Sequence, residues 1–193
     1  MIKKILIIIA TLYLAACSTT EPKPVKPAKP ETTKLYSQKE YLKLTYCLGI
    51  SDAVRHIAYM KLSNVPKSKA KERYQNRKNS RLLLATVDAV YASEFTNAWK
   101  RATRFFSSCS VNLAKVSTNR VWYGKFCLQQ THIGDVAYYS KRKGIPKSDV
   151  YQKFSKLKGR IPNKIIDRVY SIDGKRSTVK LDIWENCMRK VVE

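Results

Sequence analysis

The sequence predicts an all-α fold in which two tandem copies of a small helical repeat follow a proline-rich linker. Apolar residues recur at three- and four-residue spacing, no stretch alternates as a half-buried strand would, and landmarks recur about 80 residues apart. We place the copies at residues 35–112 and 113–193, with three to four helices each. Together they are long enough for one or two small domains with real cores.

The repeat rests on landmarks that keep their order when the chain is shifted against itself. A shift of 80 positions aligns the first cysteine, a tyrosine and an apolar-Pro-Lys-Ser motif of each copy. Two deletions then bring the closing cysteines together, so the offset drifts only from 80 to 78. The paired landmarks are Cys47 and Cys127, Tyr59 and Tyr139, residues 65–68 and 145–148, and Cys109 and Cys187.

The first predicted helix of copy one begins at a capping box and ends near Ser63. Ser37 and Glu40 have the Ser-x-x-Glu spacing in which each side chain satisfies the other residue's free amide. At the end of the helix, Asn64 aligns with Gly144, and both residue types tolerate the left-handed conformation. The apolar face of this helix carries Cys47, Ile50, Val54 and Ile57.

Three further helical segments complete each copy. The second helix follows the proline of the motif, and we expect Ser68 and Ser148 to be its N-caps. The third segment, residues 82–91 and 165–170, carries a Val-Asp-x-Val-Tyr element in copy one and a close relative in copy two. The last helix, residues 95–109 and about 178–192, carries the closing cysteine.

The N-terminus has the pattern of an export signal. Lys3 and Lys4 precede an apolar stretch, residues 5–16, that is too short to span a bilayer. Residues 14–17, Leu-Ala-Ala-Cys, resemble the lipobox of bacterial lipoproteins. The resemblance implies that residues 1–16 are removed and that Cys17 becomes the lipidated first residue. An ordinary secretory signal with a chance cysteine is the alternative.

The same resemblance implies a location in the cell envelope. Ser18 follows the cysteine where Asp would indicate inner-membrane retention, so we expect the outer membrane, with the mature chain in the periplasm. Residues 17–34 comprise the lipidated cysteine and the linker. Within the linker, the four prolines of residues 21–34 favour an extended polyproline II spacer about 40 Å long. This segment is either a spacer towards the peptidoglycan or a solvated tether of no particular length.

The other four cysteines are expected to form disulfides in this oxidising compartment. Three pairings are possible, and the repeat selects Cys47–Cys109 and Cys127–Cys187. In the chain-entropy model, closing each loop of about 60 residues adds on the order of 4 kcal/mol to the free energy of unfolding. No Cys-x-x-Cys spacing occurs and the chain has only two histidines, so we expect no metal site and no cofactor.

The charge indicates an anionic partner. Lys and Arg number 38 against 14 Asp and Glu, a net charge of +24, and loss of Lys3 and Lys4 leaves +22. Basic residues gather around the second helix of each copy, spaced to share a helical face. The candidate anion-binding residues are Lys69, Arg73, Arg77, Lys153, Lys156 and Arg160. A merely solvated basic face is the alternative, and the location argues against nucleic acid.

Catalysis has weak support in the sequence. Asp52 lies four residues before His56, and Asp135 lies three after His132, spacings that can orient an imidazole. Such pairs are more often surface contacts, and no nucleophile elbow, phosphate-binding loop or His-Glu-x-x-His motif occurs. We therefore expect no catalytic residues. Asp88 and Asp167 recur inside an apolar segment, either as partners of a nearby cation or as a buried ion pair.

These observations favour a non-catalytic adaptor. It would be tethered to the outer membrane by its lipid and would bind an anionic envelope component, namely lipopolysaccharide, phospholipid head groups or peptidoglycan. The first alternative is a protein-interaction lipoprotein, such as an inhibitor or immunity protein that binds an acidic toxin or enzyme. The second is a hydrolase with an Asp–His pair. The sequence leaves the oligomeric state open.

Overall fold

The computed structural model describes residues 34–157 and 159–193, and these residues confirm the all-helical prediction. The predicted signal, the lipid site at Cys17 and the linker up to residue 33 lie outside the described residues. Within the described residues there are eight helices and no strand. The helices are α2 (Gln38–Leu62), α3 (Lys67–Gln75), α4 (Ser80–Ala92), α5 (Ala98–Asn112), α6 (Val121–Arg142), α7 (Lys147–Lys153), α8 (Ile161–Ser171) and α9 (Arg176–Met188).

Helix α2 begins and ends as its sequence predicts. Ser37 and Glu40 form the expected capping box. At the other end, the Val65 amide donates to the Met60 carbonyl (2.9 Å) and the Asn64 amide to that of Lys61 (3.0 Å), which is a Schellman motif. Asn64 has φ 57°, and Gly144 has φ 70° after α6. These residues in the left-handed conformation therefore end α2 and α6.

The prediction that serines cap the second helices is wrong. The N-caps of α3 and α7 are Pro66 and Pro146, with extended ψ values of 144° and 145°. Each helix begins at the lysine directly after the proline, so Ser68 and Ser148 already lie in the first turn. No side chain caps either helix.

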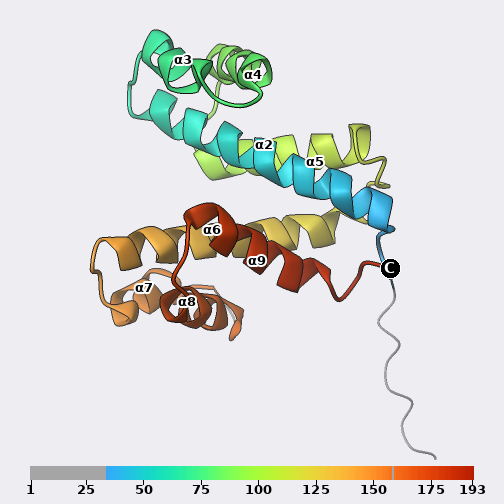
Figure 1. The fold of residues 1–193 in the computed structure, drawn as a ribbon, viewed down its shortest axis with the longest axis vertical. Coiled ribbons are helices and arrows are strands. Elements are labelled where there is room, and N and C mark those ends of the chain that lie inside the picture. The colour runs from blue at the N-terminus through green and yellow to red at the C-terminus, as the bar shows by residue number, and fades with distance from the viewer. Residues whose placement is uncertain (1–33, 158) are drawn as a thin grey trace, which may run out of the picture. The chain divides into compact units, whose positions relative to one another are not determined.

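Two long helix pairs carry two short helical arms (Figure 1). Helix α2 packs against α5, and α6 packs against α9. Both predicted disulfides are present and join the members of these pairs, Cys47 to Cys109 and Cys127 to Cys187. The first arm, α3–α4, and the second arm, α7–α8, lie at the end of the molecule opposite the C-terminus.

The hydrophobic core has one shared centre and one satellite in each arm region. The shared cluster contains residues of all four long helices, including Leu48, Phe106, Leu128 and the fully buried Trp184. Satellite clusters form around Val87 in the first arm and around Ile166 in the second, each reaching the adjoining long helices. The described residues therefore form a single unit with a common centre.

Corresponding hydrogen bonds hold each arm to its long helix. The Tyr91 hydroxyl donates to the Val65 carbonyl (2.7 Å), and the Tyr170 hydroxyl donates to that of Ile145 (2.6 Å). The Lys61 ammonium donates to the Tyr91 carbonyl (2.8 Å), and Lys141 donates to the Ile172 carbonyl (2.7 Å). These contacts fix the arms at equivalent places.

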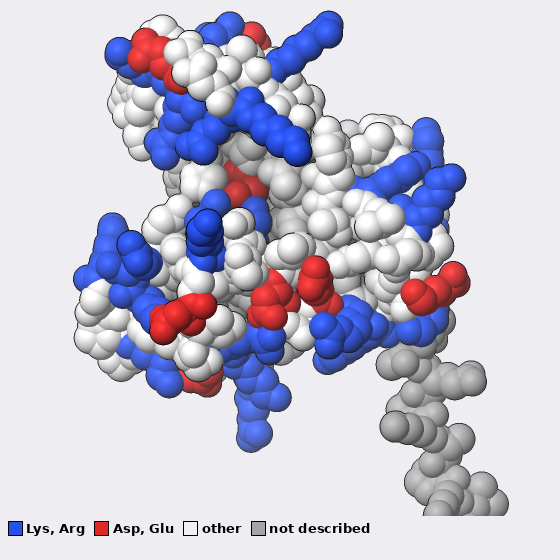
Figure 2. Space-filling view, in the orientation of Figure 1, with Lys and Arg blue, Asp and Glu red and all other residues white. Residues whose placement is uncertain are grey.

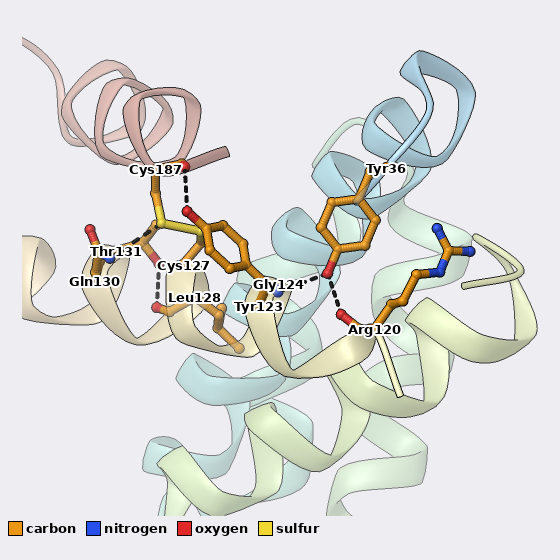
Figure 3. The surroundings of a disulfide bond; sticks show 9 residues. All are labelled: Tyr36, Arg120, Tyr123, Gly124, Cys127, Leu128, Gln130, Thr131 and Cys187. Atoms are coloured by element: carbon orange, nitrogen blue, oxygen red, sulfur yellow. Dashed lines mark hydrogen bonds between the residues drawn. A yellow bond between two sulfur atoms is a disulfide. The ribbon is translucent and has the colours of Figure 1, made fainter. Parts of the chain in front are cut away.

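The two ends of the described chain are held together beside the Cys127–Cys187 disulfide. The Tyr36 amide donates to the Val191 carbonyl (3.0 Å), and the Glu193 amide donates back to the Tyr36 carbonyl (3.1 Å). The buried Tyr36 side chain accepts a hydrogen bond from the Gly124 amide (3.1 Å) and donates to the Arg120 carbonyl (Figure 3). Among the described helices, none is long and apolar enough to cross a membrane.

Candidate functional site

Five charged side chains meet where α2, α6 and α9 come together, and we name them the ionic cluster. Arg176 on α9 bridges Asp52 on α2 (2.7 Å) and Asp135 on α6 (2.6 Å). Lys180 adds a contact to Asp52 (2.8 Å). Arg55 pairs with Asp52 (3.1 Å) and with Asp135. The cluster therefore links the N-terminal four helices to the C-terminal four by ion pairs.

The cluster is buried, and its cations outnumber its carboxylates. Only 2 % of the Asp135 side chain and 6 % of the Arg55 side chain are exposed. Three basic groups face two carboxylates, which leaves one positive charge in excess. Buried charges are tolerated only when they are closely paired, and networks of this kind are candidates for functional sites.

Neighbouring charges keep Asp52 and Arg176 ionised. Burial opposes the charged form of Asp52, but Lys180 and Arg176 hold the pKa of its carboxyl far below the ordinary value. Burial also opposes the charge on Arg176, yet its hydrogen bonds to Asp52 and Asp135 raise the pKa of the guanidinium. The charges of this pair stabilise each other.

The two histidines lie beside the cluster without forming an Asp–His hydrogen bond. His132 is 1 % exposed with Trp99 edge-on to its ring, and neither of its ring nitrogens has a hydrogen-bond partner among the described residues. Burial, helped by the positive charge of Arg55, lowers the pKa of His132 to about 2. His56 Nε2 lies 3.8 Å from Asp52 Oδ1, and burial lowers the pKa of this imidazole too. Both imidazoles are neutral near pH 7.

Potential metal ligands also converge here. Ligand atoms of Asp52, His56 and Asp135 lie within 4.8 Å of one another. Both carboxylates are already neutralised by Arg and Lys side chains, whose positive charges repel a divalent cation. The ligand types suit a metal ion, but the three cations paired with the carboxylates make this a poor metal site.

We predict that the buried His132 makes the fold acid-sensitive. The unfolded chain binds a proton at His132 near pH 6.5, whereas the folded chain binds it only near pH 2, so stability falls as pH falls through this window. Urea unfolding at pH 6.5 and 4.5 should show a loss of about 2–3 kcal/mol from this group. His132→Leu should flatten that part of the profile.

Other titratable groups near His132 must be distinguished from it in this experiment. They are Arg55, Asp52, Lys180 and Arg176, and the lowered pKa of Asp52 adds acid sensitivity of the same sign only at lower pH. His56→Gln is the comparison: the pKa of His56 is lowered too, but its side chain is 31 % exposed, so its replacement should flatten the profile less than His132→Leu does. An undiminished loss of stability between pH 6.5 and 4.5 in His132→Leu would contradict the assignment.

The basic helices are shorter than predicted. Helix α3 ends at Gln75 and α7 ends at Lys153, so Arg77, Lys156 and Arg160 lie beyond the helix ends. The prediction that each trio shares one helical face is therefore wrong. Residues 76–79 offer no apolar side chain to bury, and Asn79 adopts φ 65°. In the second arm, Gly159 adopts φ 96°.

Some arm lysines are neutralised locally. Lys67 and Lys71 pair with Asp88 (2.6 and 2.9 Å), and Lys147 pairs with Asp167 (2.8 Å). Both aspartates are about half exposed, so they are surface partners of nearby cations and the buried-pair alternative is wrong. Lys69 pairs with Glu72 (3.0 Å). The other candidate anion-binding residues have no ion pair within the described part of the chain: Arg73, Arg77, Lys153, Lys156 and Arg160.

A hollow separates the first arm from the elements below it, and we name it the cleft (Figure 2). Basic side chains stand on both of its rims, and acidic atoms are visible on its floor. Burial raises the pKa of Tyr74 on α3, which lies within electrostatic reach of Arg73, Arg77, Asp52 and Arg176. This residue therefore connects the arginines of the first arm to the ionic cluster.

Two exposed tyrosines flank the cluster on the long helices. Tyr59 is 43 % exposed and Tyr139 is 44 % exposed. The guanidinium carbon of Arg55 lies 6.0 Å from the Tyr59 ring centroid, and that of Arg176 lies 5.7 Å from the Tyr139 ring. The site thus presents aromatic rings and arginines beside a buried ionic floor, an arrangement suited to binding an anionic group.

Sequence reasoning found only part of this site. It singled out Asp52, His56, His132 and Asp135 as possible Asp–His pairs, but it missed Arg55, Arg176 and Lys180. Comparison of the chain with protein-family models, curated proteins and solved structures finds no match.

Proposed function

We propose that this protein is a non-catalytic lipoprotein of the cell envelope that binds an anionic component through the cations of its arms and cleft. The observation that carries the proposal is that Arg73 and Arg77, on either side of Tyr74 in the first arm, have no acidic partner among the described residues. Guanidinium groups bind carboxylates and phosphates in a bidentate manner, so two of them on the same arm suit such a ligand.

The lipid anchor belongs to the same proposal. Cleavage before Cys17 and acylation of its thiol would hold the protein in the outer membrane, with residues 17–34 as the linker. The lipobox-like residues 14–17 and the basic flank support this location. The two disulfides are compatible with an oxidising compartment such as the periplasm.

We also infer that the folded part arose by duplication, with copies at residues 35–112 and 113–193. Each copy would contribute two long helices, one disulfide and one arm. The equivalent hydrogen bonds of Tyr91 and Tyr170, and the equivalent ion pairs of Asp88 and Asp167, support this inference.

The second candidate is an inhibitor or immunity-type lipoprotein that binds an acidic protein. The exposed rings of Tyr59 and Tyr139 favour it, because aromatic residues are enriched in protein interfaces. The dependence of binding on salt concentration distinguishes the two candidate functions. Binding to an envelope polyanion would weaken steeply with salt and show little specificity, whereas an acidic protein held at an apolar centre would bind tightly with a weak salt dependence.

We expect Arg73→Gln/Arg77→Gln to weaken binding to the envelope ligand by about tenfold or more, since charge-assisted hydrogen bonds contribute roughly 1.5–3 kcal/mol each. Co-sedimentation of a fragment covering residues 32–193 with peptidoglycan, lipopolysaccharide and phosphatidylglycerol vesicles at low salt would measure this. Lys100→Gln/Arg104→Gln is the matched control, because it removes two exposed cations of α5 outside both arms. Equal losses in both double variants, or no binding by the unaltered fragment, would contradict the proposal.

A further inference from the structure

Three large apolar side chains are exposed near the start of the described chain. Leu42 on α2 is 61 % exposed, Trp122 on α6 is 57 % exposed, and Leu113 at the end of α5 is 43 % exposed. Trp122 is the most exposed of the three tryptophans, because Trp99 is partly buried and Trp184 is fully buried. Exposed tryptophan and leucine side chains are typical of surfaces that contact a bilayer interface.

The contacts of the neighbouring residues place these side chains at one end of the molecule. Arg120, just before α6, pairs with Glu40 in the first turn of α2 (2.6 Å). Tyr36 joins the same two helix starts through Gly124, as Figure 3 shows. The Cys47–Cys109 disulfide then ties the last turn of α5 to α2. We name this end, which carries Leu42, Leu113 and Trp122, the proximal end.

Exposed cations surround the proximal end. Lys34 precedes α2 and Lys39 lies in its first turn, Lys115 follows α5, and Lys190 follows α9. Of the acidic residues at this end, Glu40 is paired with Arg120, whereas Glu193 is exposed. Apolar side chains on the same end as several exposed lysines are complementary to a bilayer surface that carries anionic lipids.

The length of chain between Cys17 and the described residues indicates that a bilayer is the partner of the proximal end. Lys34 follows Cys17 by 17 residues, so a lipid at Cys17 would confine the proximal end to within about 60 Å of the bilayer even if the linker were fully extended. A tether of this length gives a local concentration on the order of millimolar, so a weak contact becomes well populated.

We propose that the proximal end docks on the surface of the membrane that holds the lipid, with Trp122 and Leu42 at the level of the head groups. This inference rests on the lipid anchor of the proposed function. Helix α2 is 25 residues long, about 37 Å, and the arms lie at its far end (Figure 1). Docking therefore presents Arg73 and Arg77 to the periplasm and makes a cell-wall polymer or a soluble polyanion their ligand, in place of lipid head groups of the same leaflet.

The full lipidated chain in phosphatidylglycerol-containing vesicles with brominated acyl chains tests this docking. Bromine quenches tryptophan only on close approach, so the wild-type chain should lose emission on these vesicles compared with unbrominated ones. Trp122→Phe should abolish this vesicle-dependent quenching, and Leu42→Gln should reduce it. Leu157→Gln is the matched control, because Leu157 is 49 % exposed and lies between α7 and α8 in the second arm.

Two outcomes would overturn the docking, and flotation of the vesicles tells them apart. A chain that floats with the vesicles but shows no Trp122-dependent quenching is anchored without docking, which leaves the proposed function intact. A chain that does not float with the vesicles lacks a working anchor, and both proposals then fail.

Discussion

Asp135→Ala is expected to destabilise the folded unit by about 3–5 kcal/mol, because breaking a buried ion pair leaves charge without compensation. Only 2 % of the Asp135 side chain is exposed, and its oxygens contact both Arg55 and Arg176. Without this carboxylate, three cations share the single carboxylate of Asp52 in an interior that water does not reach freely. Urea unfolding followed by circular dichroism at pH 7 measures the change.

Asp173→Ala is the matched control for this variant. Asp173 also forms an ion pair, with Lys141 (2.9 Å), but its side chain is 99 % exposed. Exposed pairs contribute about 0–1 kcal/mol, so the control should unfold almost like the wild type. Similar effects in the two variants would mean that the ionic cluster does not hold the N-terminal helices to the C-terminal ones.

Removing one disulfide by Cys47→Ala/Cys109→Ala should cost about 4 kcal/mol, because the unfolded chain regains the freedom of a long loop. The two residues are 62 positions apart. Cys47 is fully buried in the shared core, so the change also removes a sulfur atom from packed surroundings. Differential scanning calorimetry of the variant measures the loss as a lower midpoint of thermal unfolding.

The second disulfide provides the comparison for this effect. Cys127 and Cys187 are 60 positions apart, so loop closure predicts nearly the same loss for Cys127→Ala/Cys187→Ala. The Gln130 amide donates to Cys187 Sγ (3.2 Å), and this bond is lost as well (Figure 3). If both double variants unfolded at the wild-type temperature, the disulfides would not be the staples that we describe.

The ends of the helices could be predicted from the sequence where a residue type is specific for starting or stopping a helix. Asn64 and Gly144 stop the long helices because they accept a left-handed backbone, and Ser37 with Glu40 begins α2 because the pair satisfies two free amides. The disulfides followed from the recurrence of cysteines at the openings and ends of the two repeats that we propose. These features depend on neighbours in the chain or on repetition, both of which a sequence displays directly.

The ionic cluster escaped prediction because its members come from three helices. Arg176 and Lys180 belong to a segment rich in charge, where a cation ordinarily faces solvent. One signal was present in α2: Asp52 and Arg55 fall on the same helical face as the apolar Leu44 and Leu48. A charged pair within an apolar helical face indicates burial, but the sequence does not name the partner that crosses from another helix.

The basic helices of the arms show that the spacing of charged residues does not predict helix length. Spacing of Lys and Arg at three and four residues suggested longer helices, but helix length depends on an apolar face to bury. Helix α3 buries only Ala70 and α7 buries only Val150, so neither continues. Charge periodicity alone gives too little stabilisation to extend a short helix.

The pairing of Tyr36 with the C-terminal residues has a mechanical consequence. If the protein is pulled by its linker, the load enters at Lys34 and passes through the backbone bonds of Tyr36 to Val191 and Glu193 before it reaches α2. Force is thus shared between the first and last segments and is carried onward by two covalent crosslinks. Resistance to this load depends on Val191 and Glu193, so deletion of residues 191–193 would weaken the place where the molecule bears tension.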